Sequence, residues 1–362
     1  MTDAMAWPQW RSRDLDVATP MPVVEMATVE RNITRLQRAC DAAGVANRPH
    51  IKTHKSIAMA RLQLAAGAVG LTCQKLGEAE VMADAGFDDI LISYNILGSA
   101  KLKRLSALAA RVKLAVSCDN VPVADGLSGA MADADAPLAV LVECDTGRNR
   151  CGVVDPAVAA DLAGRIAALP GLRFAGLLVY PPNGPPAATR AFVDEVRRLC
   201  AARDLTVETV SAGGTPNIER IGEAGETEYR SGTSIYNDRQ MVELGAAAPE
   251  DCAVFVHATV VSRPAPGRAM IDAGSKALTS DLAGFKHFGL LVDYPCARLY
   301  QLAEEHGFVD LADCPASPEV GEVVRILPNH VCPVSNLFDR IALVRDGRGA
   351  GMLTIDARGK VA

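Results

Sequence analysis

Two lysines and two histidines lie close together early in the chain, in the stretch Arg48-Pro49-His50-Ile51-Lys52-Thr53-His54-Lys55-Ser56. A lysine held beside other cations can have its pKa lowered enough to act as an amine nucleophile. The stretch ends a short β-compatible segment and runs into an amphipathic helix from about Ser56, and α/β folds place catalytic groups at such junctions. The alternative interpretation is a basic, solvated turn. Features elsewhere in the chain decide between a reactive lysine and such a turn.

Two loops rich in glycine and hydroxyl groups occur later, Ser211-Ala212-Gly213-Gly214-Thr215 before a short helix and Ser231-Gly232-Thr233-Ser234. Barrel phosphate sites are built from two such loops, because glycine lets backbone N–H groups approach the anion and Thr or Ser adds donors. Two tight turns that need glycine are the alternative. Together with the lysine, the loops suggest a phosphorylated aldehyde bound through an amine, which describes pyridoxal 5'-phosphate on Lys52.

Two further side chains are candidates for contacts with that cofactor. Arg150 ends the motif Asp145-x-Gly147-x-x-Arg150, and its planar fork suits the phenolate oxygen of the cofactor or a substrate carboxylate. Tyr180 precedes Pro181-Pro182 and can face the cofactor ring. A surface salt bridge for Arg150 and a packed barrel-mouth position for Tyr180 are the competing interpretations.

A possible metal motif lies near the end of the chain, in Pro328-Asn329-His330-Val331-Cys332. On an extended chain residues i and i+2 point to the same side, so His330 and Cys332 can reach one metal ion together. An imidazole and a thiolate favour Zn²⁺ or a similar cation, and two protein ligands leave positions open for water or substrate. A buried pair on a strand is the alternative.

The elements that must position these residues alternate regularly. Helical patterns at 75–85, 99–111, 156–169, 187–202 and 216–224 separate strand candidates at 47–52, 69–74, 89–95, 112–118, 138–144, 173–180, 206–212 and 228–233. Eight βα units fit a closed (β/α)₈ barrel better than an open sheet of about six strands, and no G-x-G-x-x-G follows the first strand. In a barrel, Lys52, Gln74, Asn95, Asp119 and Tyr180 then all fall at the carboxyl ends of strands.

The pattern changes after about Glu243. Short strands separated by Gly, Pro and Asp follow at 253–263, 268–272, 288–293, 298–302, 322–327, 340–344 and 351–356, with hardly any helix. We therefore predict an α/β fold of the TIM-barrel type over 19–245 and a smaller all-β domain over 246–362. The early strand 22–26 can pair with this second domain.

Composition excludes several classes of function. The chain has 362 residues, 49% hydrophobic and 22% charged, and a formal charge of −6 with no long run of one sign. We expect no nucleic-acid surface, because that needs a clustered excess of Lys and Arg. Residues 1–13 lack a signal-peptide core and no stretch has membrane-spanning length. We therefore expect a cytoplasmic protein that does not bind or cross a membrane. The ten cysteines show no CxxC, and we expect them to be reduced and mostly buried.

Several motifs in the same order resemble the D-threonine aldolase and D-serine dehydratase family of alanine-racemase-like, fold-type III pyridoxal phosphate enzymes. They are Pro49-His50-Ile51-Lys52, Asp145-x-Gly147-x-x-Arg150-x-Gly152, Ser211-x-Gly213-Gly214-Thr215, Arg230-x-Gly232-Thr233 and Pro328-Asn329-His330-x-Cys332. The resemblance covers about residues 19–339.

The resemblance implies a barrel with a β domain, a homodimer, and a divalent metal ion beside the cofactor, either Zn, Mn or Mg. It places the cofactor on Lys52 and not on Lys55. It also implies phosphate contacts from Gly214, Thr215, Gly232 and Thr233, a ring contact from Tyr180, and metal ligation by His330 and Cys332. Some members carry Asp in place of this Cys.

The activity implied is cleavage of a D-3-hydroxy-amino acid to glycine and an aldehyde, since 271–281 and 304–307 look closer to the aldolase branch. In such a reaction the metal lowers the pKa of the β-hydroxyl and the cofactor ring takes up electrons. The rival is a D-serine or 3-hydroxyaspartate dehydratase that releases ammonia and a 2-oxo acid. A non-catalytic cofactor-binding protein is a third reading, but small relatives of that kind lack a β domain and an H-x-C motif.

Overall fold

The computed structural model describes Leu15 and residues 17–362, so residues 1–13, which we expect to carry no signal peptide, lie outside it. The chain divides into two compact units. The barrel unit consists of Arg35–Lys52, Ala60–Gly232 and Lys360–Ala362, and the β unit consists of Thr53–Met59, Thr233–Gly359 and the described part of Met1–Thr34. Lys52 and Thr53, although adjacent in the chain, therefore belong to different units. The predicted division near residue 245 stays a prediction.

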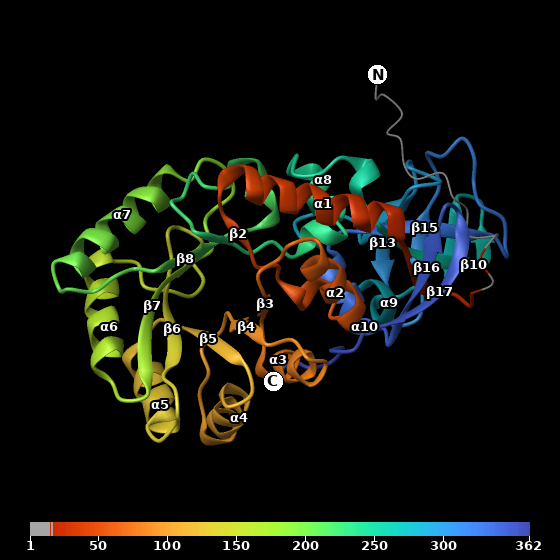
Figure 1. Cartoon of the computed structure of the whole chain (residues 1–362). Helices are drawn as coiled ribbons and strands as arrows, with labels where there is room; N and C mark the ends of the chain where they lie inside the picture. Colours follow the sequence, from red (N-terminus) through yellow and green to blue (C-terminus); the bar gives the residue numbers. More distant parts are fainter. Residues whose placement is uncertain (1–14, 16) are drawn as a thin grey trace. The chain divides into compact units, whose positions relative to one another are not determined.

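The barrel unit contains eight parallel strands in the order β2-β9-β8-β7-β6-β5-β4-β3 (Figure 1). They are β2 (Ala46–Asn47), β3 (Leu71–Cys73), β4 (Asp89–Ile92), β5 (Lys113–Cys118), β6 (Leu138–Cys144), β7 (Leu172–Val179), β8 (Thr209–Ala212) and β9 (Glu228–Tyr229). The two edges of the sheet meet, because His50 bridges Thr72 and the Thr72 N–H donates to the Pro49 carbonyl at 2.9 Å. The predicted (β/α)₈ barrel is thus confirmed.

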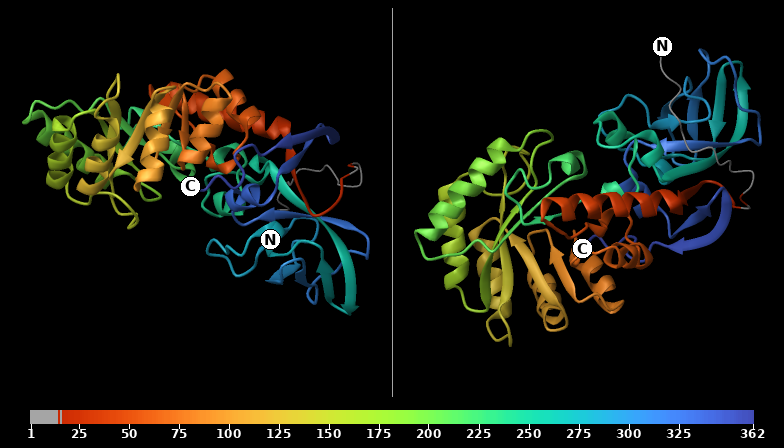
Figure 2. Two further views of the ribbon diagram at one scale, coloured as in Figure 1. Left: turned by 90° about the horizontal axis from the view of Figure 1, so that it is seen from below. Right: turned by 45° about the horizontal axis from the view of Figure 1, so that its top comes forward.

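Helices follow the strands on the outside of this sheet (Figure 2). They are α3 (Leu76–Asp84), α4 (Ser99–Ala109), α5 (Val121–Met131), α6 (Pro156–Ala168) and α7 (Ala187–Ala201). Helix α6 shows why these segments fold locally: the Asp155 carboxylate accepts from the Ala157 N–H at 2.7 Å and Pro156 occupies the first turn. Its buried residues, including Leu162 and Ile166, form one face that packs on the sheet.

Several predicted elements of the barrel are shorter than expected, including the strand before Lys52 and the helix after the glycine loop. Strand β2 ends at Asn47, and the chain reaches Lys52 through a 3₁₀ turn over Ile51–Thr53 before helix α2 (Ile57–Ala65) begins. The helix predicted over 216–224 is only a 3₁₀ segment, η3 (Thr215–Arg220). Gly222 has φ +95° and Gly225 has φ +80°, a backbone region in which no α-helix continues.

The β unit is built on a nine-stranded sheet in which β13-β14-β11-β10-β1-β16-β17 form one path and β15 joins β10 to β12. These strands are β1 (Met21–Glu25), β10 (Val254–Ala265), β11 (Arg268–Ile271), β12 (Gly289–Leu291), β13 (Arg298–Leu302), β14 (Gly307–Asp310), β15 (Val323–Pro328), β16 (Arg340–Arg345) and β17 (Arg348–Thr354). Strand β1 pairs antiparallel with β10 and parallel with β16, so the N-terminal strand belongs to this sheet.

Most helical segments of the β unit are short. Helices α1 and α2 each begin in the β unit and end in the barrel unit. The long helix α1 (Met26–Ala43) follows β1 directly, and the β unit adds η4 (Thr233–Ile235), α8 (Arg239–Glu243), η5 (Pro249–Asp251), α9 (Ser275–Leu278) and α10 (Val331–Leu337). The core of the β unit is apolar, with Val256, Val324 and Ile326 fully buried.

One pair of cysteines departs from the expectation of reduced thiols, because Cys296 and Cys314 form a disulfide with a Cα–Cα distance of 5.4 Å. Cys296 precedes β13 and Cys314 follows β14, and the antiparallel pairing of these strands brings the two together. The two cysteines are 18 residues apart in the sequence, so no short cysteine motif predicted the disulfide. Cys151 is exposed and Cys332 is half-buried, whereas the other free cysteines are buried. In the described part of the chain no helix is both long and apolar enough to cross a membrane.

Candidate active site

Lys52 lies at the carboxyl end of the barrel strands, where its amine meets Gln74. The Lys52 Nζ donates to Gln74 Oε1 at 3.4 Å, and His50 Nε2 lies 3.1 Å from the same oxygen. Ser93 Oγ lies 3.2 Å from His50 Nε2. Strands β2, β3 and β4 thus deliver four polar side chains to one point, which supports the predicted position of Lys52.

The hydrogen bonds fix which way the Gln74 amide faces. Its Nε2 donates to the Ser93 carbonyl at 2.9 Å, which turns Oε1 toward Lys52 and His50. Because Oε1 is only an acceptor, His50 must carry its proton on Nε2, and its Nδ1 is then free to accept the Lys52 backbone N–H at 3.4 Å. His50, whose role the sequence left open, therefore contacts both the Lys52 backbone and Gln74, the residue that accepts from the Lys52 amine.

The glycine loop after β8 is shaped by close contacts. Gly213 has φ +146°, and a Cβ there would lie 2.7 Å from the Arg230 backbone nitrogen. Gly214 has φ +142°, and a Cβ there would lie 2.8 Å from the Tyr180 ring. The second glycine therefore lets the Tyr180 ring lie against the loop. Tyr229 holds the loop by donating to the Gly214 carbonyl at 2.7 Å.

The hydroxyl groups predicted to bind phosphate have different surroundings. Thr215 Oγ1 lies 2.9 Å from Ser231 Oγ, so the structure brings the loops after β8 and β9 together. Ser211 is fully buried: it donates to Glu228 at 2.6 Å and accepts from Arg230 Nε at 2.8 Å. The Ser211 side chain is thereby part of a charged network inside the barrel. Gly232 is buried at the end of the barrel unit, and Thr233 begins η4 of the β unit.

The loop after β6 presents two arginines rather than one. Asp145 organises it by accepting from the backbone N–H groups of Gly147, Arg148 and Arg150. Burial raises the pKa of the Asp145 carboxyl, but these N–H groups outweigh it and lower the pKa overall. Arg148 Nη2 donates to the Tyr180 hydroxyl at 2.9 Å, while Arg150 has its guanidinium 5.2 Å from the Tyr180 ring centre.

The sequence suggested that the metal motif is extended, but in the structure the chain becomes helical at Val331. His330 occupies the N-cap position of α10 without a side-chain capping bond, and Cys332 lies in the first turn of this helix, so the i, i+2 argument from strand geometry is wrong. The two side chains nevertheless interact, because Cys332 favours the charged form of His330 and raises its pKa. Burial lowers the pKa of His330, but Cys332, Asp238 and Asp281 favour its charged form and raise the pKa to about 9. A site that favours positive charge suits a divalent cation.

Hydroxyl and carboxyl groups of the β unit hold this motif in place. Thr53 Oγ1 lies 3.2 Å from Cys332 Sγ, and Thr233 Oγ1 lies 3.8 Å from it. The buried Asp238 accepts the Val331 N–H at 3.0 Å and the Met241 N–H at 3.0 Å, which locks the turn between the two candidate ligands. Burial raises the pKa of the Asp238 carboxyl.

The donor set is small. Among residues 15 and 17–362 no group of three or more His, Cys, Asp or Glu side chains is arranged to hold a metal ion. Asp281 Oδ2 lies 3.4 Å from His330 Nδ1 as a hydrogen-bond partner. An imidazole and a thiolate side by side still match the chemistry of a borderline cation whose remaining positions are taken by water or substrate.

Sequence reasoning left several of these residues out of the site. Gln74 and Asp119 were recognised only as polar strand ends, and Asp119 accepts the Gly152 N–H at 3.0 Å behind the Asp145 loop. Arg148 and Asp238 were not among the predicted site residues. Arg148 could have been found as the second arginine of the Asp145 loop, whereas the contact of Asp238 with Val331 joins residues 93 positions apart.

Comparison with known proteins assigns the family. The model of the alanine racemase N-terminal domain matches residues 24–240, and the model described as "Putative serine dehydratase domain" matches residues 253–344. A barrel of this kind followed by such a β domain defines the alanine-racemase-like class. Within it, the chain belongs to the D-threonine aldolase and D-serine dehydratase family, as its motifs indicated.

Three relatives illustrate the similarity. The chain is 37% identical to the D-threonine aldolase of Arthrobacter sp, over 95% of this chain and 93% of that one. The crystal structure of D-threonine aldolase from Filomicrobium marinum matches with a TM-score of 0.88 and 34% identity, covering 96% and 97% of the two chains. A mutant D-threo-3-hydroxyaspartate dehydratase, solved in the metal-free form, matches with a TM-score of 0.84 and 30% identity, covering 94% and 98%.

Proposed function

We propose that this protein is a pyridoxal phosphate- and divalent metal-dependent lyase that cleaves D-3-hydroxy-amino acids of the D-threonine type to glycine and an aldehyde. The observation that carries the proposal is the Lys52 amine at the carboxyl end of the barrel, held by Gln74 Oε1 at 3.4 Å. The similarity to D-threonine aldolase over 95% of the chain supports the choice of reaction.

The barrel unit offers residues that fit the cofactor. Lys52 supplies the amine, Gly213, Gly214 and Thr215 supply a glycine loop with a hydroxyl, and Tyr180 lies against Gly214. In this proposal Gly232 and Thr233 complete the phosphate site, and Arg150 binds the phenolate oxygen or the substrate carboxylate. Bound pyridoxal phosphate withdraws electrons from the substrate Cα, which lets a bond at that carbon break.

His330 and Cys332 are the proposed metal ligands. A divalent ion held by them would supply Lewis-acid chemistry that lowers the pKa of a substrate β-hydroxyl. Thr53 and Thr233 contribute by placing hydroxyl groups at the Cys332 sulfur, and Asp238 by holding the turn between the ligands. These residues do not need to touch the substrate to act.

Proton transfer in the barrel unit falls to Lys52. The Nζ of Lys52, when it is not bonded to a cofactor, would give a proton to or take one from the substrate Cα, as a general acid or base. Gln74 Oε1 accepts a hydrogen bond from this amine, and His50 and Ser93 keep the Gln74 amide in its orientation. This contact positions the free amine at the carboxyl end of the barrel.

Dehydration of D-serine or 3-hydroxyaspartate is the second candidate, because the family includes dehydratases and a serine dehydratase model matches the β unit. The two reactions need the same residues and differ in the bond that breaks. Lys52 would then remove the α-proton while the metal makes the β-hydroxyl a better leaving group.

The decisive experiment is incubation of the purified protein with D-threonine, with glycine and ammonia measured in parallel. Aldolase activity gives glycine, and ammonia without glycine would overturn the proposal in favour of the dehydratase. EDTA should abolish turnover while the visible absorbance of the lysine-bound cofactor remains. Lys52→Ala should lose this absorbance, whereas Lys55→Ala should keep it, because Lys55 Nζ donates to the Ala357 carbonyl at 3.4 Å as a structural contact.

Assembly and location form part of the proposal. We propose a homodimer in the cytoplasm, in agreement with the family resemblance and with the composition of the chain. Light scattering of the purified protein gives the mass of the particle, and a monomer at working concentration would contradict the dimer. The identity of the metal, Zn, Mn or Mg, follows from elemental analysis of the same sample.

A further inference from the structure

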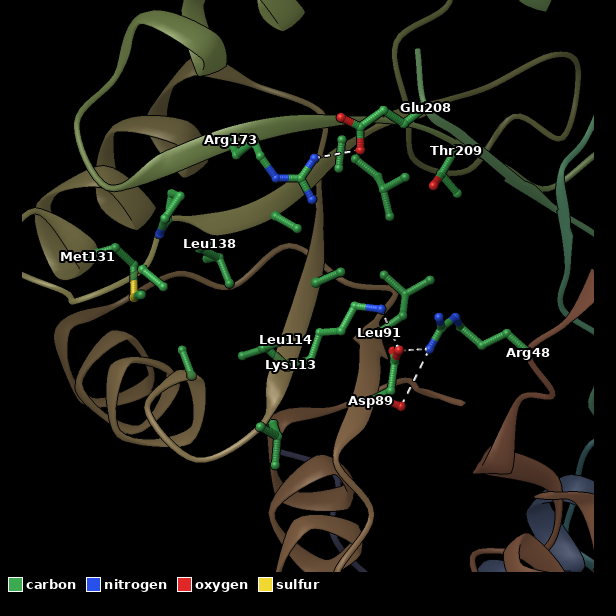
Figure 3. Close-up of a pocket in the computed structure, with 18 of the residues that line it drawn as sticks. Arg48, Asp89, Leu91, Lys113, Leu114, Met131, Leu138, Arg173, Glu208 and Thr209 are labelled. Carbon is green, nitrogen blue, oxygen red and sulfur yellow. Dashed lines mark hydrogen bonds and ion pairs between the residues drawn. The ribbon is translucent and has the colours of Figure 1, made fainter. Parts of the chain in front are cut away.

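The barrel has a pocket at the amino ends of its strands, away from the carboxyl ends that carry Lys52. Its volume is about 360 Å³, within the range of small-molecule sites. Figure 3 shows an apolar hollow between two groups of charged side chains, Arg173 with Glu208 on one side and Arg48, Asp89 and Lys113 on the other. All of these residues belong to the barrel unit.

Small side chains make this hollow. Ala115, Ala139 and Ala175 line it from the neighbouring strands β5, β6 and β7. Ala115 and Ala139 remain partly exposed, although the residues before and after each of them are buried. Barrels of this type usually fill their interior with layers of bulky, branched side chains. At this level the interior is open instead, and Leu91 and Leu141 give it apolar walls.

The register of the sheet places a charged group beside the hollow. Leu91 pairs with Ala115, Ala115 with Ala139, and Ala139 with Arg173, so the four lie in one row across β4 to β7. Arg173 Nη1 donates to Glu208 at 2.6 Å, and the side chains of this ion pair are 45% and 55% exposed. One guanidinium has five N–H donors and one carboxylate accepts several hydrogen bonds, so both groups can bind a ligand while paired.

The charges of the pocket balance. Three cations face three carboxylates: Arg48, Lys113 and Arg173 against Asp89, Glu208 and Glu228. A ligand with a single charge would leave the pocket with a net charge, whereas a zwitterion would not. The apolar hollow adds a place for a hydrocarbon side chain, and about 150 Å³ already suffices for benzene.

We propose that this pocket binds a free α-amino acid with an apolar side chain. The carboxylate of the ligand pairs with Arg173, its ammonium group pairs with Glu208, and its side chain enters the hollow beside Ala115 and Ala139. This site is separate from the proposed catalytic residues, and its occupation requires neither the cofactor nor the metal ion.

The test compares three probes that share one branched hydrocarbon tail: L-leucine, 4-methylpentanoate and 3-methylbutylamine. Calorimetric titration of the cofactor-loaded protein should show saturable binding of L-leucine. The two singly charged probes should bind at least about tenfold more weakly, because each lacks one charge-assisted hydrogen bond. The visible absorbance of the cofactor should stay unchanged during the L-leucine titration, which distinguishes this site from the catalytic one.

Variants locate the binding. Ala115→Leu and Ala139→Leu should each abolish L-leucine binding by filling the hollow, and their partial exposure leaves room for the larger side chain. Ala201→Leu adds the same bulk at an exposed position of helix α7, and this variant should bind L-leucine normally. Arg173→Gln and Glu208→Gln should each weaken binding about tenfold.

Three outcomes would overturn the proposal: no saturable heat with L-leucine, equal binding in the filled variants, or a cofactor spectrum that shifts with the binding curve. Equal affinity for 4-methylpentanoate would overturn the assignment of a zwitterion. Thermal unfolding of Ala115→Leu and Ala139→Leu shows whether each is folded, and one folded variant is enough for the test. Failure of the aldolase assay would leave this result unaffected.

Discussion

Thr53 Oγ1 lies 3.2 Å from the sulfur of Cys332, although 279 positions separate the two residues. Thr53 directly follows Lys52 in the chain and belongs to the same unit as the metal motif. A single peptide bond therefore joins the proposed cofactor lysine to a residue that contacts a proposed metal ligand. Thr53 is therefore expected to orient Cys332, and substitution of Thr53 tests this role.

Thr53→Val should weaken metal binding by about tenfold, because hydrogen bonds to a metal ligand orient it and tune its affinity. Valine has nearly the same shape, and Thr53 is fully buried, so the change removes mainly the hydroxyl. Metal affinity is measured by competition with a chromogenic chelator. Thr53→Ser keeps the hydroxyl and serves as the control, and equal affinities of all three proteins would contradict the role.

Gln74→Leu should lower kcat/KM by about tenfold, because the Lys52 amine loses its acceptor and a misplaced catalytic group is costly. Cofactor retention after dialysis, read from the visible absorbance, gives a second measure that does not depend on turnover. Gln74→Glu keeps an acceptor but loses the donor to the Ser93 carbonyl, so its kcat/KM should lie between those of the native protein and Gln74→Leu. A Gln74→Leu protein with unchanged absorbance and rate would show that Lys52 is held by other groups.

Gly214→Ala should lose most of its bound cofactor. The added Cβ would lie 2.8 Å from the Tyr180 ring, so the ring or the loop must move. Gly98→Ala is the matched control, since Gly98 also has a positive φ, +89°, but has nothing within 4 Å of the added Cβ. Both variants carry backbone strain, of the order of 1 kcal/mol. Cofactor content should fall only in the first, and equal loss in both would assign the effect to strain.

The buried His257 should make the protein sensitive to acid. Burial, with Arg325, lowers its pKa to about 3, and Asp293 opposes this effect. Between about pH 6.5 and pH 3 the unfolded chain binds a proton that the folded chain does not, so the free energy of unfolding falls as the pH falls. The contribution is fully present above pH 6.5 and should drop by roughly 2 to 3 kcal/mol between pH 7 and pH 4.5.

The measurement is urea unfolding of the native protein and of His257→Gln at both pH values. Glutamine does not titrate, so the variant should lose less stability on acidification, even if it is less stable at pH 7. A parallel decline in both proteins would assign the acid sensitivity to other groups.

Much of the barrel could be predicted because its signals are local. The inner strands, such as β6 and β7, carry apolar runs, and helices α3 to α7 follow β3 to β7, with buried apolar residues at helical spacing as in α6. The position of Lys52 after the first barrel strand follows from the count. The predicted helix over 216–224 was wrong because Gly222 and Gly225 take positive φ angles, so only the short η3 forms.

By itself the sequence determined the order of the elements, the polar strand ends and the motifs that assign the family, because these depend on neighbours along the chain. Only the tertiary structure decided that Gln74 faces Lys52, that Arg148 binds Tyr180, that Cys296 pairs with Cys314, and that His330 and Cys332 meet on a helical turn. Hydrogen bonds and disulfides need atoms within a few ångströms of each other. Which distant residues come that close depends on how strands pair and helices pack, and no local pattern encodes it.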